Sequence, residues 1–156
     1  MQRPDADAIL TWRYPQPYDF YNISSDSTES FFNPASPHFS VFDADGVLIG
    51  FLSIGIESQV PGGDYSEPAV DIGIGLRPDQ TGRGLGRIVI QQFIDEIIAP
   101  GDFPPLLRAT IAAFNQRSLK TFRSLGFRET GTFTTRVGNR NIEWIIVTRC
   151  TLTPTQ

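Results

Sequence analysis

The chain has 156 residues, a formal net charge of −4 and one cysteine, Cys150. This length suits a single domain, placed at 1–156, that buries roughly 70% of the surface its unfolded form exposes. One cysteine excludes an intrachain disulfide and favours a reducing compartment, so we expect a cytoplasmic protein. The negative charge, without a run of Lys and Arg, argues against a nucleic-acid partner. The sequence has neither a signal-peptide pattern nor the roughly 20 apolar residues that span a bilayer, so no membrane partner is expected.

The first part of the chain predicts short strands and turns. Residues 9–12 predict a strand, and the aromatic stretch 14–22 contains two prolines that favour extended or turn structure. A short helix is predicted over 28–32, after Ser and Asp residues that can cap it. Residues 39–42 and 47–56 predict two strands, and the Asp-Gly pair between them is typical of an antiparallel hairpin.

The remainder alternates between strands and helices. A strand is predicted over 69–76, and apolar residues at helical spacing predict the principal helix over 84–98. A strand over 106–112, a helix over 115–125 and a hairpin over 127–151 follow. Strands at the start, followed by alternating strands and helices, predict one mixed α/β sheet.

The segment 71–86 carries the strongest chemical signal. In it a strand passes through a turn marked by proline into a helix start, with glycine at every second position from 82 to 86. Unpaired N–H groups and the dipole at a helix N-terminus favour an anion, and glycines let phosphate oxygens approach the backbone. Arg83 and Arg87 add positive charge, which suggests a diphosphate ligand.

Two common phosphate-binding motifs do not fit this segment. A P-loop needs G-x-x-x-x-G-K-[ST], but Arg87 and Ile88 follow Gly86. A dinucleotide fingerprint needs G-x-G-x-x-G, whereas the spacing here is G-x-G-x-G, with Arg87 where the third glycine belongs. For a glycine cluster alone, a tight strand-to-helix turn without a ligand is the alternative.

The run G-R-G-L-G after V-D-I-G-I-G-L-R-P-D resembles the acetyl-CoA signature of the GNAT superfamily of N-acetyltransferases, usually [QR]-x-x-G-x-[GA]. The resemblance extends to residues 115–118 and 125–127, which look like the family's asparagine helix and its terminal G-F, and covers about 38 to 150. It implies a single-domain GNAT-like α/β fold with a mixed, mostly antiparallel sheet, flanking helices and a splayed central strand pair. It further implies an enzyme that moves an acetyl group from acetyl-CoA to a primary amine, on a small molecule or a peptide N-terminus, by direct attack on the thioester. No metal is implied, and the oligomeric state, including a homodimer, is left open.

The resemblance also assigns coenzyme-binding positions. Strand-end backbone groups are implied to bind the pantetheine arm, the glycine loop the diphosphate, and the asparagine of the second helix the coenzyme. These positions are Ile74, Gly75, Leu76, Thr81, Gly82, Arg83, Gly84, Leu85, Gly86, Arg87 and Asn115. Thr81 departs from the family pattern, because it stands at the [QR] position with Gln80 before it.

The candidate catalytic residues are Asp71 and Ser118. Asp71 stands where ribosomal-protein-type N-acetyltransferases, which this segment resembles, often carry a carboxylate, so it is the candidate general base; a salt-bridged aspartate is the alternative. It shares a strand face with Gly73 and Gly75, whose missing side chains predict a trough for the thioester. Phe122 replaces the tyrosine that protonates the leaving thiolate in many members. Ser118 is therefore the alternative proton donor, or else an ordinary helix serine.

The acceptor is less constrained. At neutral pH a lysine-type amine needs about 4 to 5 kcal/mol to become a free base and an α-amine only about 1, which favours an amine of low pKa. The aromatic stretch 14–22 and the loop 62–65 either flank the acceptor or cap the core. His38 is the only histidine and is expected to be structural or exposed rather than a metal ligand. A catalytically weak acyl-CoA-binding module is the rival function.

Overall fold

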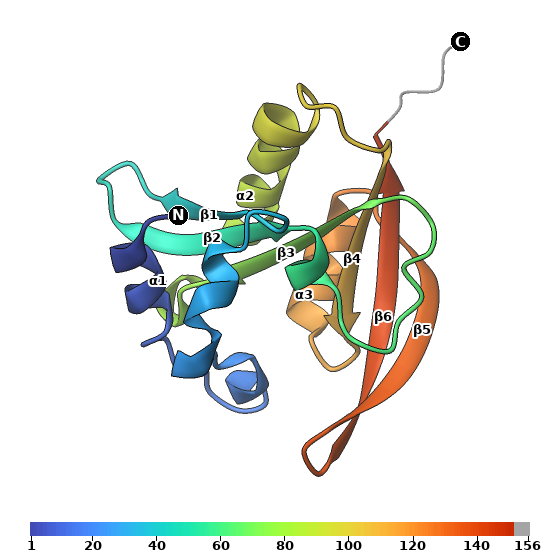
Figure 1. Cartoon of the computed structure of the whole chain (residues 1–156), viewed down its shortest axis with the longest axis horizontal. Helices are drawn as coiled ribbons and strands as arrows, with labels where there is room; N and C mark the ends of the chain where they lie inside the picture. Colours follow the sequence, from blue (N-terminus) through green and yellow to red (C-terminus); the bar gives the residue numbers. More distant parts are fainter. Residues whose placement is uncertain (152–156) are drawn as a thin grey trace.

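A computed structural model describes residues 1–151, apart from the side chains of Ser25 and Ser27. Six strands form one twisted sheet in the order β1-β2-β3-β4-β6-β5 (Figure 1). The strands are β1 (His38–Phe42), β2 (Leu48–Ile54), β3 (Val70–Leu76), β4 (Leu106–Ala112), β5 (Arg128–Val137) and β6 (Arg140–Cys150). The α-helices are α1 (Arg3–Ile9), α2 (Leu85–Phe93) and α3 (Gln116–Ser124). Shorter helical turns are η1 (Tyr18–Tyr21), η2 (Ser25–Phe32), η3 (Ile56–Ser58), η4 (Pro78–Gln80) and η5 (Ile94–Ile98).

The sheet is split between its two central strands. β1, β2 and β3 pair antiparallel, as do β4, β6 and β5. The parallel pairing of β3 with β4 is limited to Val70 with Leu107 and Asp71 with Arg108. Beyond these two pairs β3 leaves β4, so the predicted splayed central pair and mostly antiparallel sheet are confirmed.

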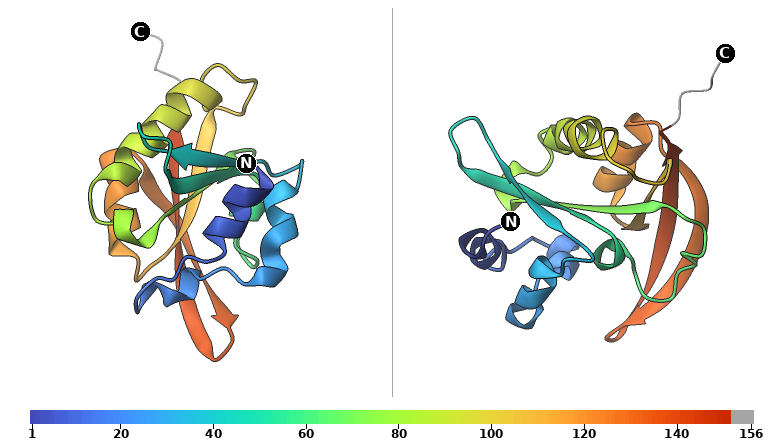
Figure 2. Two further views of the ribbon diagram at one scale, coloured as in Figure 1. Left: turned by 90° about the vertical axis from the view of Figure 1, so that its left-hand side faces the viewer. Right: turned by 45° about the horizontal axis from the view of Figure 1, so that its top comes forward.

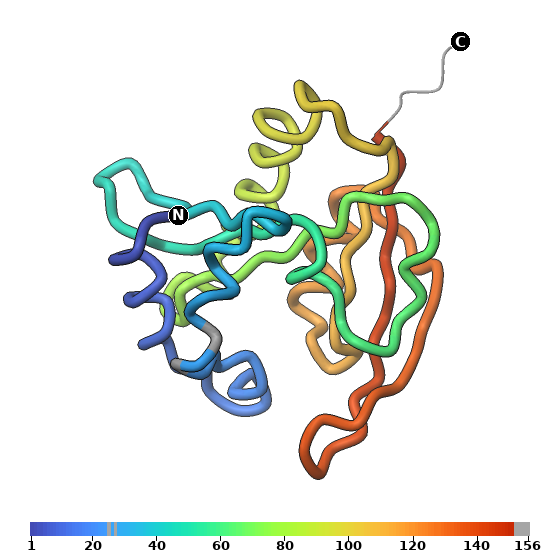
Figure 3. The backbone as a smooth tube through the Cα atoms, in the orientation of Figure 1, coloured from blue at the N-terminus to red at the C-terminus, as the bar shows by residue number. Residues whose placement is uncertain are grey.

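Helices cover both faces of the sheet. Figure 2 shows α1 and η2 on one face and α2 and α3 on the other. The main core lies under α2 and α3, where Ile90, Leu107 and Leu119 are fully buried. A smaller core around Ile9 and Phe31 holds the N-terminal helices on the opposite face. Figure 3 follows the connection between β2 and β3 as it passes over the β5-β6 hairpin, where Gly62 comes close to Thr135.

The N-terminal prediction is wrong, because residues 9–12 end a helix rather than form a strand. Pro4 suits the first turn of α1, and the Asp5 carboxylate accepts a hydrogen bond of 3.0 Å from the Gln2 N–H. Ala6 and Ile9 bury one side of this helix. A run as short as Ile-Leu-Thr-Trp fits a strand or a helix end equally well, and here the helix-start residues Pro4 and Asp5 favour the helix.

The two longer helices follow the sequence pattern. Residues 85–98 are helical, as predicted apart from Gly84, which is the N-cap. The last turn, η5, is a π-helix in which the Ala99 N–H donates to the Ile94 carbonyl at 2.8 Å. The Asn115 side chain caps α3 by accepting a hydrogen bond of 3.1 Å from the Ser118 N–H. This cap fixes Asn115 and Ser118 beside the open end of β3.

Candidate functional site

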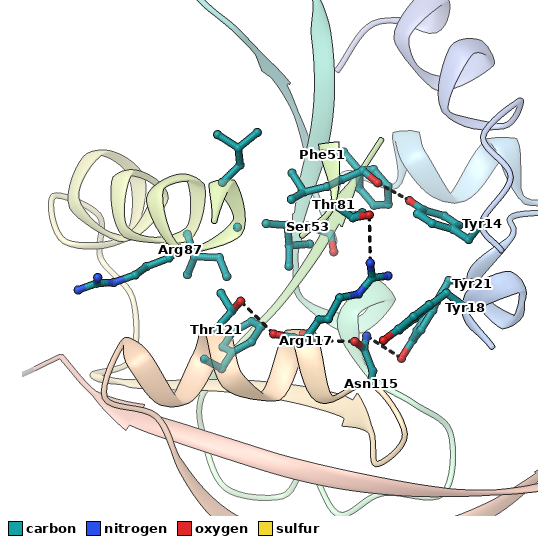
Figure 4. Close-up of a pocket in the computed structure, with 18 of the residues that line it drawn as sticks. Tyr14, Tyr18, Tyr21, Phe51, Ser53, Thr81, Arg87, Asn115, Arg117 and Thr121 are labelled. Carbon is teal, nitrogen blue, oxygen red and sulfur yellow. Dashed lines mark hydrogen bonds between the residues drawn. The ribbon is translucent and has the colours of Figure 1, made fainter. Parts of the chain in front are cut away.

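A cavity of about 1060 Å³ lies along the end of β3 (Figure 4). The glycine loop and α3 form one end of it, and the N-terminal segment with β1 and β2 forms the other. All of the predicted coenzyme-binding residues line it: Ile74, Gly75, Leu76, Thr81, Gly82, Arg83, Gly84, Leu85, Gly86, Arg87 and Asn115. Ser118 also lines the cavity, whereas Asp71 does not.

The glycine loop and the first turn of α2 form a site suited to an anion. Gly82 and Gly84 have φ angles of +73° and +78°, a left-handed conformation that glycine adopts without strain. Gly84 is the N-cap of α2, and no side chain caps this helix. Its first N–H groups are therefore available to a ligand, and the helix dipole favours negative charge there. Figure 4 shows the exposed Arg87 guanidinium pointing away from Arg117.

The register of the sheet identifies which backbone groups of β3 face the split. The Arg77 N–H donates to the Ile49 carbonyl at 2.8 Å, and Gly50 lies opposite Leu76. In an antiparallel ladder, hydrogen-bonded and non-bonded pairs alternate, so Leu76 and Ile74 turn their N–H and C=O groups away from β2. These two residues therefore offer a row of main-chain donors and acceptors along the open edge.

Gly75 plays a different part from the one predicted. It lies opposite Phe51 in a hydrogen-bonded pair, so its own backbone groups point toward β2. A Cβ at Gly75 would lie 2.3 Å from the Phe51 ring, and one at Gly73 would lie 2.7 Å from the Ser53 hydroxyl. The expected trough is thus filled by side chains of β2, and these glycines serve packing against Phe51 and Ser53.

Tyr14 contacts the open edge directly. Its hydroxyl donates a hydrogen bond of 2.7 Å to the Leu76 carbonyl. Burial raises the pKa of Tyr14 to about 12, while the nearby charge of Arg117 acts in the opposite direction. The hydroxyl therefore stays protonated at neutral pH and remains a hydrogen-bond donor.

Two further tyrosines of the N-terminal segment contact α3 (Figure 4). The Arg117 guanidinium lies 3.8 Å from the centre of the Tyr18 ring, and its Nη1 donates to the Thr81 hydroxyl at 3.2 Å. The Asn115 Nδ2 donates to the Tyr21 hydroxyl at 3.2 Å, and burial raises the pKa of Tyr21. The segment is thus attached to the same side chains that flank the glycine loop.

Asp71 is held in a buried ion pair. Arg108 donates to its two carboxylate oxygens from Nε at 2.6 Å and from Nη2 at 2.8 Å, and Gln59 Nε2 donates at 2.7 Å. Only 3% of Asp71 and 4% of Arg108 are exposed. A carboxylate so placed stabilises the junction of β3 and β4, and it has no access to the cavity. The structure does not support the prediction that Asp71 is the general base; the salt-bridged alternative describes it.

Phe122 and Ser118 are the two α3 positions that the sequence marks for protonation of the leaving thiolate, and both line the cavity. Phe122 is buried and packs edge-on against Phe127, with ring centres 5.0 Å apart. It replaces a hydroxyl with an apolar contact, as its sequence position predicts. Ser118, half-buried in the first turn of α3, lines the cavity one turn earlier.

The other end of the cavity is mostly aromatic and apolar, with a few polar side chains. Trp12, Tyr14, Ile23, Phe31 and Phe51 form its apolar walls, and His38, Ser53 and Glu57 are polar. No motif marks His38 or Glu57 in the sequence. The signal is the strand register, which places His38 opposite Ser53 and Ser53 opposite Gly73 in one row across the sheet.

The sequence left open whether the aromatic stretch 14–22 flanks the acceptor or caps the core, and in the structure its residues divide between the cavity wall and the core. Tyr14, Tyr18 and Tyr21 line the cavity, while Phe20 packs against Trp144 at 5.7 Å. The loop 62–65 does not line the cavity. Its Tyr65 ring stacks instead on Arg108, 4.8 Å away.

Within residues 1–151, no group of three or more His, Cys, Asp and Glu side chains could hold a metal ion. Over the same described residues, none of the helices has the length and apolar character needed to cross a bilayer.

Comparisons with known proteins agree with this geometry. Residues 6–127 match the family model of the acetyltransferase (GNAT) family. The L-amino acid N-acyltransferase MnaT of Escherichia coli (strain K12) is 32% identical over 108 residues, which cover 69% of this chain and 59% of that protein. The chain thus matches less than two thirds of this relative's length.

Two solved structures share the fold. One is a spermidine N-acetyltransferase SpeG chimera from Vibrio cholerae and hSSAT, with a TM-score of 0.71, 20% identity and coverage of 97% of this chain and 94% of that one. The other is smu.2055 from Streptococcus mutans, with a TM-score of 0.68, 19% identity and 97% coverage of both chains. At these identities the structures support the fold alone. The match to the family model and the MnaT identity together show that this chain belongs to the acetyltransferase (GNAT) family.

Proposed function

We propose that this chain is an N-acetyltransferase that moves an acetyl group from acetyl-CoA to a primary amine by direct attack on the thioester. The observation that carries the proposal is the joining, in one cavity, of the uncapped helix start at Gly84 to the open backbone edge at Ile74 and Leu76. A diphosphate would bind the free N–H groups at the helix start, and an amide-bearing pantetheine arm would bind the open backbone edge. A single acyl-CoA molecule would use both.

The coenzyme would be held mainly by backbone. N–H groups of 82–87 would bind the diphosphate, Arg117 would add charge beside Thr81, and Ile74 and Leu76 would pair with the pantetheine arm. An N–H of this edge, near Leu76, would hold the oxygen of the tetrahedral intermediate. Ser118 would return a proton to the thiolate that leaves.

The acceptor end of the cavity favours a cationic amine. Glu57 is the only acidic side chain that lines it among the described residues, and the lining Arg and Lys side chains all come from the glycine loop, α2 and α3. Aromatic walls and one carboxylate suit an ammonium group. No positive side chain of β1, β2 or the N-terminal segment lines this end to bind a neighbouring carboxylate. We therefore place amines without an α-carboxylate ahead of amino acids.

Relatives suggest the acceptors to test first. The E. coli relative is named as an L-amino acid N-acyltransferase, and the Vibrio structure is a spermidine N-acetyltransferase. A panel of spermidine, simple alkyl and arylalkyl amines, L-amino acids and a peptide with a free N-terminus is incubated with acetyl-CoA. Free thiol release and product mass are measured for each. Acetylation of the amines with higher kcat/KM than the amino acids is the expected result.

The rival function is an acyl-CoA-binding module with little turnover, favoured by Phe122 at the tyrosine position. Acetyl-CoA binding measured by calorimetry, with no thiol release across the panel, would support the rival. Failure to bind acetyl-CoA would reject both functions. The proposal also includes a cytoplasmic location, which the single cysteine supports, and a single domain over 1–156, which the shared six-stranded sheet supports.

A further inference from the structure

The reaction needs a group that accepts a proton, and Asp71 is committed to Arg108. At the acceptor end of the cavity the other ionisable side chains are His38, Glu57 and the tyrosines. Burial raises the pKa of Tyr14 and of Tyr21, so these hydroxyls stay protonated at neutral pH and can donate but not accept the amine's proton. The Tyr18 ring is covered by the Arg117 guanidinium. His38 is the remaining side chain whose usual pKa lies close to neutral.

The hydrogen bonds around His38 fix which ring nitrogen is available. Its Nδ1 lies 3.0 Å from the Ser36 carbonyl oxygen, which can only accept a hydrogen bond. Nδ1 must therefore carry the proton in the neutral ring, and Nε2 keeps its lone pair. The ring is held between Phe31 and Phe51, with centres 5.1 Å and 6.2 Å from its own.

Ser36 joins His38 to Glu57. Ser36 is fully buried, and its hydroxyl donates to the Ile54 carbonyl at 2.6 Å while accepting from the Glu57 N–H at 2.9 Å. The same residue thus positions the imidazole through its carbonyl and the carboxylate-bearing turn through its hydroxyl. Asn33 Nδ2 donates to the Glu57 carboxylate at 3.3 Å.

The charges around His38 suit reversible protonation. Burial lowers the pKa of His38 below the usual imidazole value, and the Ser36 carbonyl and the Glu57 charge partly oppose this effect. The amino group of Met1, which donates to the His38 carbonyl at 3.2 Å, also disfavours the imidazolium. From α1, the Asp5 carboxylate contacts Ser40, two residues along β1. At neutral pH the ring is therefore neutral and can accept a proton.

We propose that His38 Nε2 is the general base that takes the proton from the acceptor ammonium, directly or through one water, and that Glu57 stabilises the resulting imidazolium. This role rests on the proposed amine acetylation. His38 and its β2 partner Ser53 line the same cavity as Ile74 and Leu76, so an amine in that cavity can lie between the imidazole ring and the open edge of β3.

The proton balance is complete. The ammonium gives one proton to Nε2, and the free amine attacks the thioester carbonyl carbon. The C–S bond breaks and the thiolate leaves with its electron pair. The second proton on nitrogen then passes through the Ser118 hydroxyl to the thiolate, giving the amide and the free thiol, and the imidazolium releases its proton to solvent.

Because His38 is the only histidine, its ring signal can be followed by NMR without assignment. We expect the NMR pKa of wild-type His38 to lie below the usual imidazole value and to coincide with the acid limb of the kcat/KM profile for the best amine. His38→Gln should lose that limb and about 100-fold in kcat/KM at pH 7.5, with acetyl-CoA affinity and circular dichroism unchanged. Glu57→Gln should lower the NMR pKa of His38, whereas Glu96→Gln, an exposed change in η5, should not.

The possible outcomes distinguish failure of the proposed amine acetylation from failure of the proposed role of His38. A wild-type chain that binds acetyl-CoA but acetylates no amine overturns the proposed function and, with it, the role of His38. An active wild type whose acid limb differs from the NMR pKa, or survives in His38→Gln, overturns the role of His38 alone. The NMR comparison uses the wild-type chain, so the claim is decided even if His38→Gln does not fold.

Discussion

The Tyr14 hydroxyl donates a hydrogen bond of 2.7 Å to the Leu76 carbonyl, across 62 residues of sequence. That carbonyl points to the open edge of β3, where the proposed coenzyme would bind. In the free protein the tyrosine therefore takes an acceptor that a pantetheine amide would use. Under the proposed function, the N-terminal segment and the coenzyme would compete for the Leu76 carbonyl.

Tyr14→Phe should change acetyl-CoA affinity and the free energy of unfolding in opposite directions. Loss of the hydroxyl leaves the Leu76 carbonyl without its partner and destabilises the free protein by about 1 to 3 kcal/mol. Acetyl-CoA affinity should rise about fivefold, because the carbonyl is then free for the ligand. Calorimetry and thermal unfolding measure the two effects. Tyr65→Phe is the matched control: its hydroxyl bonds the Val60 N–H at 2.8 Å outside the cavity, so it should affect stability alone. Weaker binding by Tyr14→Phe would contradict the competition.

The ionisation of Tyr14 predicts an alkaline change in stability. Its pKa is about 12 in the folded protein and about 10 in the unfolded chain. Because the folded value is raised, the contribution of the neutral phenol is complete below pH 10 and is lost as pH rises toward 12. Urea unfolding of the wild type and of Tyr14→Phe between pH 9 and 12 measures this, and the wild type should lose more stability. Parallel curves for the two proteins would be the contrary result.

Asp71→Asn should act on stability rather than on proton transfer. The change leaves the buried Arg108 charge without its carboxylate, a loss of about 3 to 5 kcal/mol. The double variant Asp71→Leu with Arg108→Met should recover most of this, since it removes both charges together. Unfolding curves measure stability, and the kcat/KM pH profile tests catalysis. A stable Asp71→Asn protein that loses the acid limb would restore Asp71 as the base.

Gly84→Glu should abolish coenzyme binding. Gly84 and Gly46 have nearly equal φ angles, +78° and +76°, and a Cβ meets nothing within 4 Å at either. A side chain at either site therefore pays a similar backbone strain of about 1 to 2 kcal/mol. Gly46→Glu, on the β1-β2 turn, should keep wild-type acetyl-CoA affinity, whereas Gly84→Glu places a negative charge at the start of α2. If the Gly84→Glu and Gly46→Glu variants bound acetyl-CoA with equal affinity, the diphosphate could not be assigned to the glycine loop.

Arg117→Met should weaken acetyl-CoA binding about tenfold, or about 1.4 kcal/mol. The guanidinium bridges Tyr18 and Thr81 at the mouth of the glycine loop, where it can pair with phosphate oxygens. Arg123→Met is the control on the same helix, because Arg123 pairs with Glu129 and does not line the cavity. The dissociation constants of the two variants are compared by calorimetry. A loss of equal size in both would indicate a general effect of charge.

The cavity end formed by the glycine loop could be predicted from the sequence because it depends on local backbone geometry. Glycines with positive φ and a helix start leave a local pattern, and the cavity lining from Thr81 to Arg87 follows from it. The register between β2 and β3 could not be predicted from the sequence of either strand alone. As a result Gly75 was predicted as a ligand contact, although it accommodates the Phe51 ring.

The acceptor end depends on long-range pairing. His38 becomes part of the cavity only when β1 pairs with β2 and β2 with β3, and Ser36 and Glu57 meet only when η3 folds back on the segment before β1. The partner of Asp71 lies 37 residues away on β4. The alternation of residues along β3 assigns Asp71 to one face of the strand, but it does not predict that Arg108 packs against that face.

Only two residue pairs join β3 to β4, and the Asp71–Arg108 ion pair belongs to the second of them. Past that point no strand among the described residues pairs with the side of β3 that Ile74 and Leu76 turn away from β2, and the Tyr14 hydroxyl bonds only the Leu76 carbonyl there. If the proposed pantetheine arm bonds both residues, it would extend the sheet along β3 as a short extra strand. Amide hydrogens at these two positions should therefore exchange slowly with deuterium only while the arm is in place.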